Sequence, residues 1–303
     1  MILRDKADIR TVLYMITTTA LLLVQWNITG FTLWLYPAYL FFSVAVAVIA
    51  HNHNHLPIWR PRLLNIFTDY WLTLFYGFPA FGWIPTHNLN HHRLNNRDGD
   101  YTITYRMSEG NNLVTLLTYP SISSYHQQKP IRDYMKRLWH TNRTNFYLAA
   151  SQYVVLALYY IITLLIDWQK ALLFVVIPHQ VALFSILIFN YVQHVHADEE
   201  SQYNHSRNFV GPLLNAMLFN NGFHTIHHEK AGLHWSKTPE AFKKIEPMID
   251  PSLNERSFWG YIFRVYIFGL FAPRLRTHSK RLERLQQQNV ATAETEGQPV
   301  HSR

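Results

Sequence analysis

The chain contains no cysteine among its 303 residues. A disulfide framework, a thiolate zinc site, an iron–sulfur cluster and a cysteine nucleophile are therefore all excluded. Charged residues are also scarce, because Asp, Glu, Lys and Arg together make up 15% of the chain, whereas 49% is hydrophobic. An ordinary soluble domain carries about 25% charged residues, so this composition points to another class of protein.

The shortage of charge is concentrated in three long stretches. No Asp, Glu, Lys or Arg occurs in residues 11–59, 144–166 or 171–197. A membrane-crossing helix needs roughly 20 mainly apolar residues, so the first stretch has room for two crossings and each of the others for one. We therefore predict an all-α integral membrane protein with four spans. Their expected positions are residues 11–29, 36–54, 146–166 and 171–192.

The basic residues indicate how the spans are oriented. An even number of spans places both termini on one side, and the two short turns on the other side hold only Lys170 of the 27 Lys and Arg residues. By the positive-inside rule, we expect the termini and the long connecting segments in the cytoplasm. Basic loops beside anionic lipid headgroups also account for the formal net charge of +8. Since no nucleic-acid-binding module is recognisable, we expect no nucleic-acid partner.

Two further segments are rich in aromatic residues. Residues 70–92 carry no charge but contain two glycines and two prolines, which favours a kinked or interfacial helix over a fifth span. Residues 257–272 carry Arg264 in their middle and predict a second interfacial segment. We expect residues 1–275 to form one unit, and the polar segment 276–303 to be a short charged helix followed by a disordered tail.

Eighteen histidines are present, and many recur at helical spacing. Residues three or four positions apart lie on the same face of a helix. Four sets meet this condition, and each lies at the predicted cytoplasmic end of a span or in a cytoplasmic segment. The sets are His51 with His55, His87 with His91 and the adjacent His92, Asn190 with His194, and His224 with His227 and His228.

The clustered histidines indicate a metal centre, and we expect a helical cytoplasmic cap to carry them. Neutral imidazole binds iron, copper, nickel and zinc, and paired imidazoles on neighbouring helices can aim two nitrogens at one ion. Nine such histidines exceed the four ligands that a single zinc takes, so two metals are the simpler inference. A ferritin-like site would need glutamates and Glu-x-x-His motifs, and this sequence has no such pattern.

Other histidines do not share these faces. His179 lies inside the fourth predicted span, and its role stays open. The roles of His53, His196 and His234, which lie close to the clusters but out of register, also stay open. Five lone histidines are expected to be surface or hydrogen-bonded residues: His126, His140, His205, His278 and His301.

Three motifs, HNHNH at 51–55, HNLNHH at 87–92 and HTIHH at 224–228, are interleaved with the four spans. In this order they resemble the three histidine boxes of the integral-membrane fatty acid desaturases. The resemblance implies that the nine clustered histidines are metal ligands, and that Asn190 adds a ligand through water beside the direct ligand His194. It also implies a non-haem diiron centre that uses O2 and two electrons to introduce a double bond into a fatty acyl chain.

The same scaffold is similar to membrane alkane hydroxylases and to bacterial enzymes that decarboxylate fatty acids to terminal alkenes. The histidine boxes do not separate these reactions, because the outcome depends on which carbon faces the irons. Two other classes also stay open. One is a metal or proton transporter with histidine carriers, and the other is a hydrolase with one zinc, three ligands and a water.

The resemblance implies two kinds of partner besides membrane lipid. The substrate would be a fatty acyl group carried as the free acid, on CoA, on an acyl-carrier protein or in a lipid. No fused cytochrome b5-like domain is evident, so the electrons would come from a separate ferredoxin, rubredoxin or cytochrome b5. A basic cytoplasmic surface would suit an acidic donor of this kind.

Acidic residues beside the boxes are candidates for orienting the imidazoles. A ligand histidine usually donates its second N–H to a carboxylate or a carbonyl. Asp98 and Asp100 follow the second box, and Glu229 follows the third; from their places in the sequence we favour Asp98 and Glu229. The aromatic run at 71–83 is a candidate wall for an acyl chain, although an interfacial belt explains it equally well.

Overall fold

The computed structural model describes residues 2–28 and 34–295 and is mostly helical. Four of its helices are long and apolar enough to cross a membrane. They are α1 (Asp8–Asn27), α2 (Leu35–His55), α6 (Arg143–Ile166) and the continuous helix Trp168–His194, which contains α7 (Trp168–Ala171), a π-helical turn (Leu172–Val176) and α8 (Ile177–His194). The predicted all-α membrane fold is confirmed, and each observed span end lies within three residues of its predicted position.

The remaining elements are shorter, apart from one long helix. The other α-helices are α3 (Arg62–Tyr76), α4 (His92–Leu94), α5 (Leu113–Thr141), α9 (Pro212–Met217), α10 (His224–Glu229), α11 (Thr238–Ile245), α12 (Phe258–Ile262) and α13 (Lys280–Thr295). Two further π-helical segments are Ile84–His91 and Phe263–Ile267, and 3-10 turns occupy Ala80–Gly82, Trp235–Lys237, Glu246–Met248, Pro251–Leu253, Phe268–Leu270 and Pro273–Leu275. Two short strands, β1 (Asn208–Phe209) and β2 (Asn254–Glu255), pair in parallel.

The core lies where α2 and α8 pack against each other. Every side chain from Ala45 to His51 of α2 is buried, because α1, α3 and α8 all pack against this helix. The lipid-facing helices α1 and α6, in contrast, leave large apolar side chains such as Leu23 and Leu165 exposed. Such exposed apolar side chains are expected of helices that contact lipid rather than water.

The segment predicted as a kinked helix is broken at Gly77. This residue ends α3 with a φ of +79°, a conformation that favours glycine. The chain also passes so close to His179 that a Cβ at position 77 would lie 2.4 Å from the His179 Cβ. After this break, the π-helical segment Ile84–His91 leads into α4, and both carry the second histidine box.

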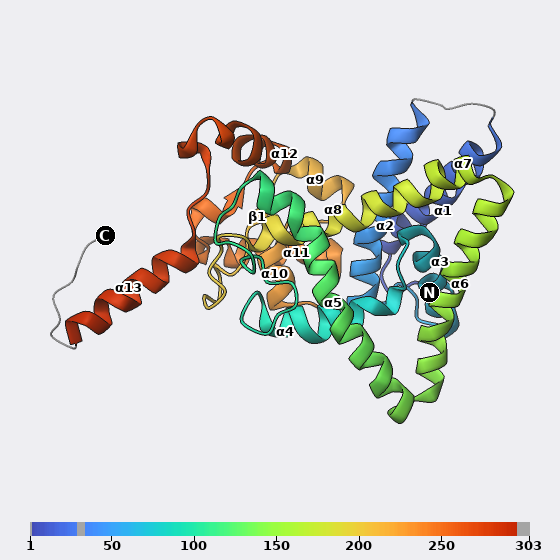
Figure 1. Cartoon of the computed structure of the whole chain (residues 1–303), viewed down its shortest axis with the longest axis horizontal. Helices are drawn as coiled ribbons and strands as arrows, with labels where there is room; N and C mark the ends of the chain where they lie inside the picture. The colour runs from blue at the N-terminus through green and yellow to red at the C-terminus, as the bar shows by residue number, and fades with distance from the viewer. Residues whose placement is uncertain (1, 29–33, 296–303) are drawn as a thin grey trace.

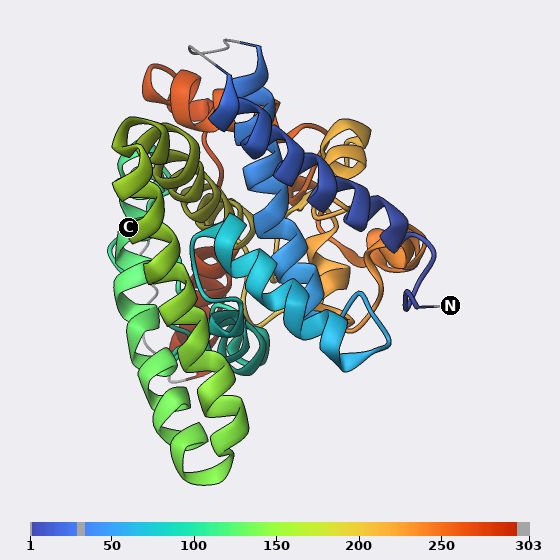
Figure 2. The same cartoon turned by 90° about the vertical axis from the view of Figure 1, so that its right-hand side faces the viewer.

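The 29-residue helix α5 has no counterpart among the sequence predictions. Its sequence is polar on average and includes Pro120 and Pro130, so neither apolar content nor helix propensity indicates a long helix. It begins with a capping box at Asn112, whose side chain accepts the backbone N–H groups of Val114 and Thr115. Together α5 and α6 form a long hairpin that projects from the rest of the molecule, with its turn at Asn142 (Figures 1 and 2).

The last two predicted segments are partly described. Residues 257–272 form α12 and the π and 3-10 turns after it, and they expose Trp259 and Phe271. Helix α13 extends away from the body (Figure 1), although Arg284 in its second turn donates to Asp198 at 2.7 Å. Residues 296–303 of the predicted disordered tail lie outside the described residues, as do positions 29–33, which include most of the first predicted turn.

Candidate metal centre

All nine clustered histidines converge in space, and they do so in two groups. Within each group, one ring nitrogen from every histidine lies within 4.8 Å of those from the others. The first group is His51, His55, His87, His92 and His227, and the second is His91, His194, His224 and His228. The C-terminal ends of α2 and α8 therefore meet the second box and α10 at one place.

The division between the groups differs from the helical faces expected from the sequence. His87 and His91 were expected to share a face, but His87 joins His92 in the first group and His91 joins the second. The cause is the π-helical segment Ile84–His91, because π-helical turns bring residues five positions apart together. The Nε2 atoms of His87 and His92 are 3.0 Å apart.

The third box is also divided. His224 and His228, four positions apart on α10, belong to the second group with their Nε2 atoms 3.1 Å apart. His227 lies between them in the sequence and points into the first group, where its Nε2 is 2.9 Å from that of His51. A six-residue helix therefore serves both groups.

The distances between nitrogens fit metal ligands better than they fit a hydrogen-bond network. Nε2 of His227 lies 2.9 Å from Nε2 of His51 and 3.0 Å from Nε2 of His92. A neutral imidazole has only one N–H, so one nitrogen cannot satisfy several others in this way. Ligand nitrogens at right angles around an ion, each about 2.1 Å from it, would be about 3.0 Å apart. The donor set and its spacing therefore fit a metal ion in each group.

Burial favours the neutral, metal-binding form of imidazoles in both groups. Burial lowers the pKa of His87, His224 and His228 far below the ordinary value, and repulsion from neighbouring histidines lowers it further. The neutral ring offers a lone pair to a metal ion, whereas the imidazolium does not. These three imidazoles, which come from both groups, are therefore in the form that binds metal at neutral pH.

The carboxylate that orients a clustered histidine is Asp100, not Asp98. Oδ2 of Asp100 accepts Nδ1–H of His91 at 2.8 Å, and both side chains are almost completely buried. The carboxylate also accepts the backbone N–H groups of Asn96 and Thr102. Burial alone would raise the Asp100 pKa, but attraction to His91 and the hydrogen bonds lower it overall. Asp98 is exposed, and its predicted role is not supported.

Glu229 does not reach a clustered histidine either. Within the described part of the chain, its carboxylate comes within 4 Å of one histidine, His205, at 3.9 Å. His205 was expected to be a surface or hydrogen-bonded residue; its side chain is 3% exposed, and its ring centroid lies 5.5 Å from that of His228. The His205 carbonyl accepts Nδ1–H of His194 at 3.2 Å. Tertiary packing positions this carbonyl beside His194, so helical spacing in the sequence could not reveal it.

Asn190 lies beside a small cavity next to the first group. Its Nδ2 donates to the Tyr119 hydroxyl at 2.6 Å, and that hydroxyl donates to the Thr102 carbonyl at 2.7 Å. The cavity has a volume of about 100 Å³ and is lined by Asn190, His87, apolar side chains of α8 and a mostly polar stretch of α5 that includes Gln127, Gln128 and Ile131. Part of the predicted aromatic wall, Tyr76, Phe78 and Trp83, also lines it.

The four histidines whose roles were open lie outside both groups. His179 has both ring nitrogens bonded, one to the Tyr160 hydroxyl at 2.7 Å and one to the Leu74 carbonyl at 2.9 Å. His196 is bonded in the same way to residues 109 and 277. These contacts are structural.

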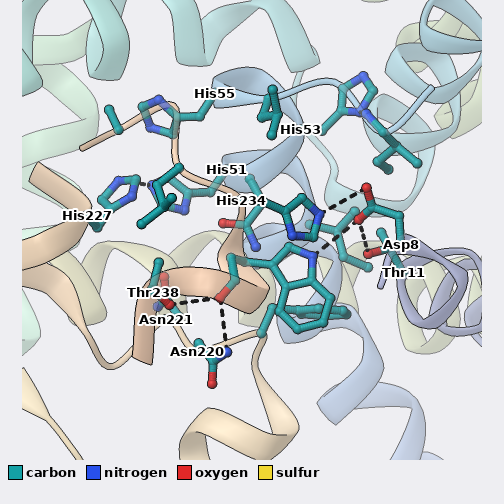
Figure 3. A pocket seen from close by; sticks show the side chains of 18 of the residues that line it. Asp8, Thr11, His51, His53, His55, Asn220, Asn221, His227, His234 and Thr238 are labelled. Carbon is teal, nitrogen blue, oxygen red and sulfur yellow. Dashed lines mark hydrogen bonds and ion pairs between the residues drawn. The ribbon is translucent and has the colours of Figure 1, made fainter. Parts of the chain in front are cut away.

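Another pocket, shown in Figure 3, lies beside the first group. The other two histidines with open roles, His53 and His234, line it. His51, His55 and His227 face one part of it, and His234 faces the other, where it pairs with Asp8 at 3.1 Å. His53 also lines this pocket, and its Nε2 lies 3.5 Å from a carboxylate oxygen of residue 69. The pair of His234 with Asp8 ties the start of α1 to the region beside the metal groups.

Comparison with known proteins bears on this site. A family model described as fatty acid desaturase matches residues 25–260, a segment of 236 residues that includes all nine clustered histidines. No curated protein and no solved structure gives a match. The chain belongs to the fatty acid desaturase family, a family of oxidoreductases.

Proposed function

We propose that the protein is an O2-dependent diiron desaturase that introduces a double bond into a fatty acyl chain. The observation that carries this proposal is the pair of adjacent imidazole groups, with five and four members, beside a cavity that has an apolar wall on α8. His92 and His228 belong to different groups, and their rings stack with centroids 4.4 Å apart. Two irons bound there would supply the O2-dependent oxidation of an unactivated C–H bond.

Each residue has a defined part in this proposal. The nine histidines would hold the metals, and Asn190 would complete the four-membered group through a water. Asp100 would fix the tautomer and the ring orientation of His91, because its carboxylate accepts Nδ1–H and leaves Nε2 free to bind metal. His194 is held in the same way by the His205 carbonyl.

The cavity between α5 and α8 would hold the reacting part of the acyl chain. Its apolar wall includes Ile131, Leu183 and Leu187, and its other end reaches His87 and Asn190. A volume of about 100 Å³ is well below the roughly 300 Å³ of small ligand pockets, so it would accept a short segment of the chain. The rest of the acyl group would lie along α5 or in the bilayer.

The partners and the orientation are part of the same proposal. The histidine-bearing ends of α2 and α8 lie at one end of the bundle, where Asp8 at the start of α1 also lies. The positive-inside rule puts this end in the cytoplasm. There an acidic ferredoxin, rubredoxin or cytochrome b5 would deliver electrons, and the acyl group would arrive as the free acid, on CoA, on a carrier protein or in a lipid.

Hydroxylation and decarboxylation to a terminal alkene are the alternatives within this family. The transporter hypothesis is weakened, because both nitrogens of His179, which lies well away from the ends of its span, are engaged in hydrogen bonds. A one-zinc hydrolase would use three ligands, whereas nine histidines converge here.

Mass-spectrometric profiling of lipids and volatile products tests the proposal. Cells would express the wild type, His91→Ala or His140→Ala, the last being an exposed histidine on α5. We expect an unsaturated acyl product from the wild type and the control, and none from His91→Ala at equal membrane abundance. A hydroxylated or shortened terminal-alkene product would replace desaturation by the corresponding alternative. Unchanged product from His91→Ala would refute the proposed centre.

A further inference from the structure

A third cavity, of about 400 Å³, lies near the C-terminal end of the described chain and contains none of the clustered histidines. It is formed by β2, the π-helical segment Phe263–Ile267 and the residues that lead into α13. Five of its lining residues are cationic and two are acidic. They are Arg207, Arg264, Arg274, Arg276 and Lys280, with Glu255 and Glu283. The cavity is therefore strongly basic.

Its two acids are already paired. Arg264 pairs with Glu255, and Lys280 lies 3.0 Å from Glu283. The other three cations, all arginines, have no carboxylate within 4 Å among the residues that the structure describes. Three guanidinium groups therefore line one cavity without an ion-pair partner among the described residues.

Arg207 is the unusual member of this set, because its side chain is 1% exposed. Its Nη1 donates to the carbonyls of Val192 and Val195 at 2.9 Å, which caps the end of α8. Its guanidinium carbon lies 4.9 Å from the ring centroid of Tyr261, and this cation–π contact adds weak stabilisation. Its Nε is buried and has no partner among the described residues. A buried cation with spare donors at the wall of a cavity calls for an anion.

The surroundings of the cavity indicate the source of that anion. The segment of α12 and the turns after it exposes Trp259, Phe268 and Phe271, with exposed fractions of 61%, 57% and 85%. Exposed aromatic side chains of this kind are typical of segments at the headgroup level of a membrane. The cavity volume falls within the roughly 300 to 1,000 Å³ of ligand pockets.

We propose that this cavity binds the phosphate headgroup of an anionic membrane phospholipid. Guanidinium groups bind phosphate through paired hydrogen bonds, and Arg207, Arg274 and Arg276 offer such donors from several sides. Because Arg207 also holds the carbonyls on either side of His194, a bound lipid would stabilise the end of α8 that carries this histidine. The inference does not depend on which reaction the metal groups catalyse.

Native mass spectrometry of the full-length protein in neutral detergent tests this site. The probes are phosphatidylglycerol, phosphatidylcholine and inorganic phosphate. The test variant is Arg274→Gln/Arg276→Gln, and the matched control is Lys243→Gln/Lys244→Gln, which removes two exposed cations from α11. We expect phosphatidylglycerol to bind the wild type and the control, and to bind the test variant at least about tenfold more weakly, because charge-assisted hydrogen bonds are lost.

Three results would overturn the proposal. Equal binding of phosphatidylglycerol to the test variant and the control would mean that these arginines hold no headgroup. Equal binding of phosphatidylcholine would mean that the anionic lipid is not selected. If inorganic phosphate displaces the lipid, and the test variant no longer binds phosphate, the site would be assigned to a soluble anion. If the double variant does not fold, the same assay is run on the single variant Arg274→Gln, because Arg274 is exposed.

Discussion

Replacing Asp100 by Asn should weaken metal binding at the group that contains His91. In the wild type, Oδ2 of Asp100 accepts from His91 at 2.8 Å and from the Asn96 backbone at 2.8 Å, while Oδ1 accepts from the Thr102 backbone at 2.7 Å. An asparagine amide must point its NH2 at one of these sides, where it would face a backbone N–H. The variant therefore loses the negative charge and gains a clash between two donors.

The expected loss of metal affinity depends on how fully the Asp100 carboxylate is hydrogen-bonded. Asp100 is 0% exposed, so water cannot replace the lost acceptor. Changes in groups that orient a metal ligand typically reduce metal affinity or activity by about 10- to 100-fold, or about 1.4 to 2.7 kcal/mol. We expect Asp100→Asn to fall within this range.

The assay is the metal content per chain, measured by elemental mass spectrometry at a series of free metal concentrations. Asp98→Asn is the matched control, because Asp98 lies two residues away and is exposed. We expect the control to match the wild type and Asp100→Asn to require more metal for the same occupancy. If Asp100→Asn binds metal like the wild type, Asp100 does not orient a ligand. If the control loses metal equally, the assignment of Asp100 over Asp98 is wrong.

Two further predictions concern the helix break and the cavity. Gly77→Ala should destabilise the protein by about 1 to 3 kcal/mol, because its φ is +79° and the new Cβ would meet His179. A lower thermal midpoint in detergent is expected, whereas Gly232→Ala, with no atom within 4 Å of the new Cβ, should melt close to the wild type; equal midpoints for both variants would argue against strain at Gly77. Leu187→Trp should fill the cavity beside Asn190 and lower turnover while the metal content stays unchanged. Unchanged turnover would show that the acyl chain does not use this cavity, and joint loss of metal and turnover would point to a damaged centre instead.

The sequence predicts the spans well, because a gap in charge is a direct consequence of crossing a membrane. It also predicts which histidines converge, since helical spacing and the ends of the spans bring them to one region. It does not predict how they divide into groups. That division depends on the π-helical segment Ile84–His91, and local sequence does not distinguish π from α turns.

The structure brings Asp100, rather than the favoured Asp98, to His91, and the reason is again local backbone geometry. Asn95 and Asn96 adopt positive φ angles of 50° and 67°, so the chain turns back after the second box. This turn brings Asp100 to His91, whereas distance along the sequence favoured Asp98.

Helix α5 shows a second limit of sequence reasoning. The helix is polar on average and contains two prolines, yet it packs beside α8 and supplies part of the cavity wall. Its position depends on tertiary contacts such as the hydrogen bond between Tyr119 and Asn190. The substrate side of the site was therefore harder to predict than the metal side.

The most direct test of the diiron centre is the metal content of the active protein. The full-length chain, purified from cells grown with iron, would be measured for iron and zinc per chain and for O2-dependent formation of unsaturated acyl product. Two imidazole groups predict about two irons per chain, and product that rises and falls with iron content. Full activity in protein that contains zinc and no iron would contradict the account.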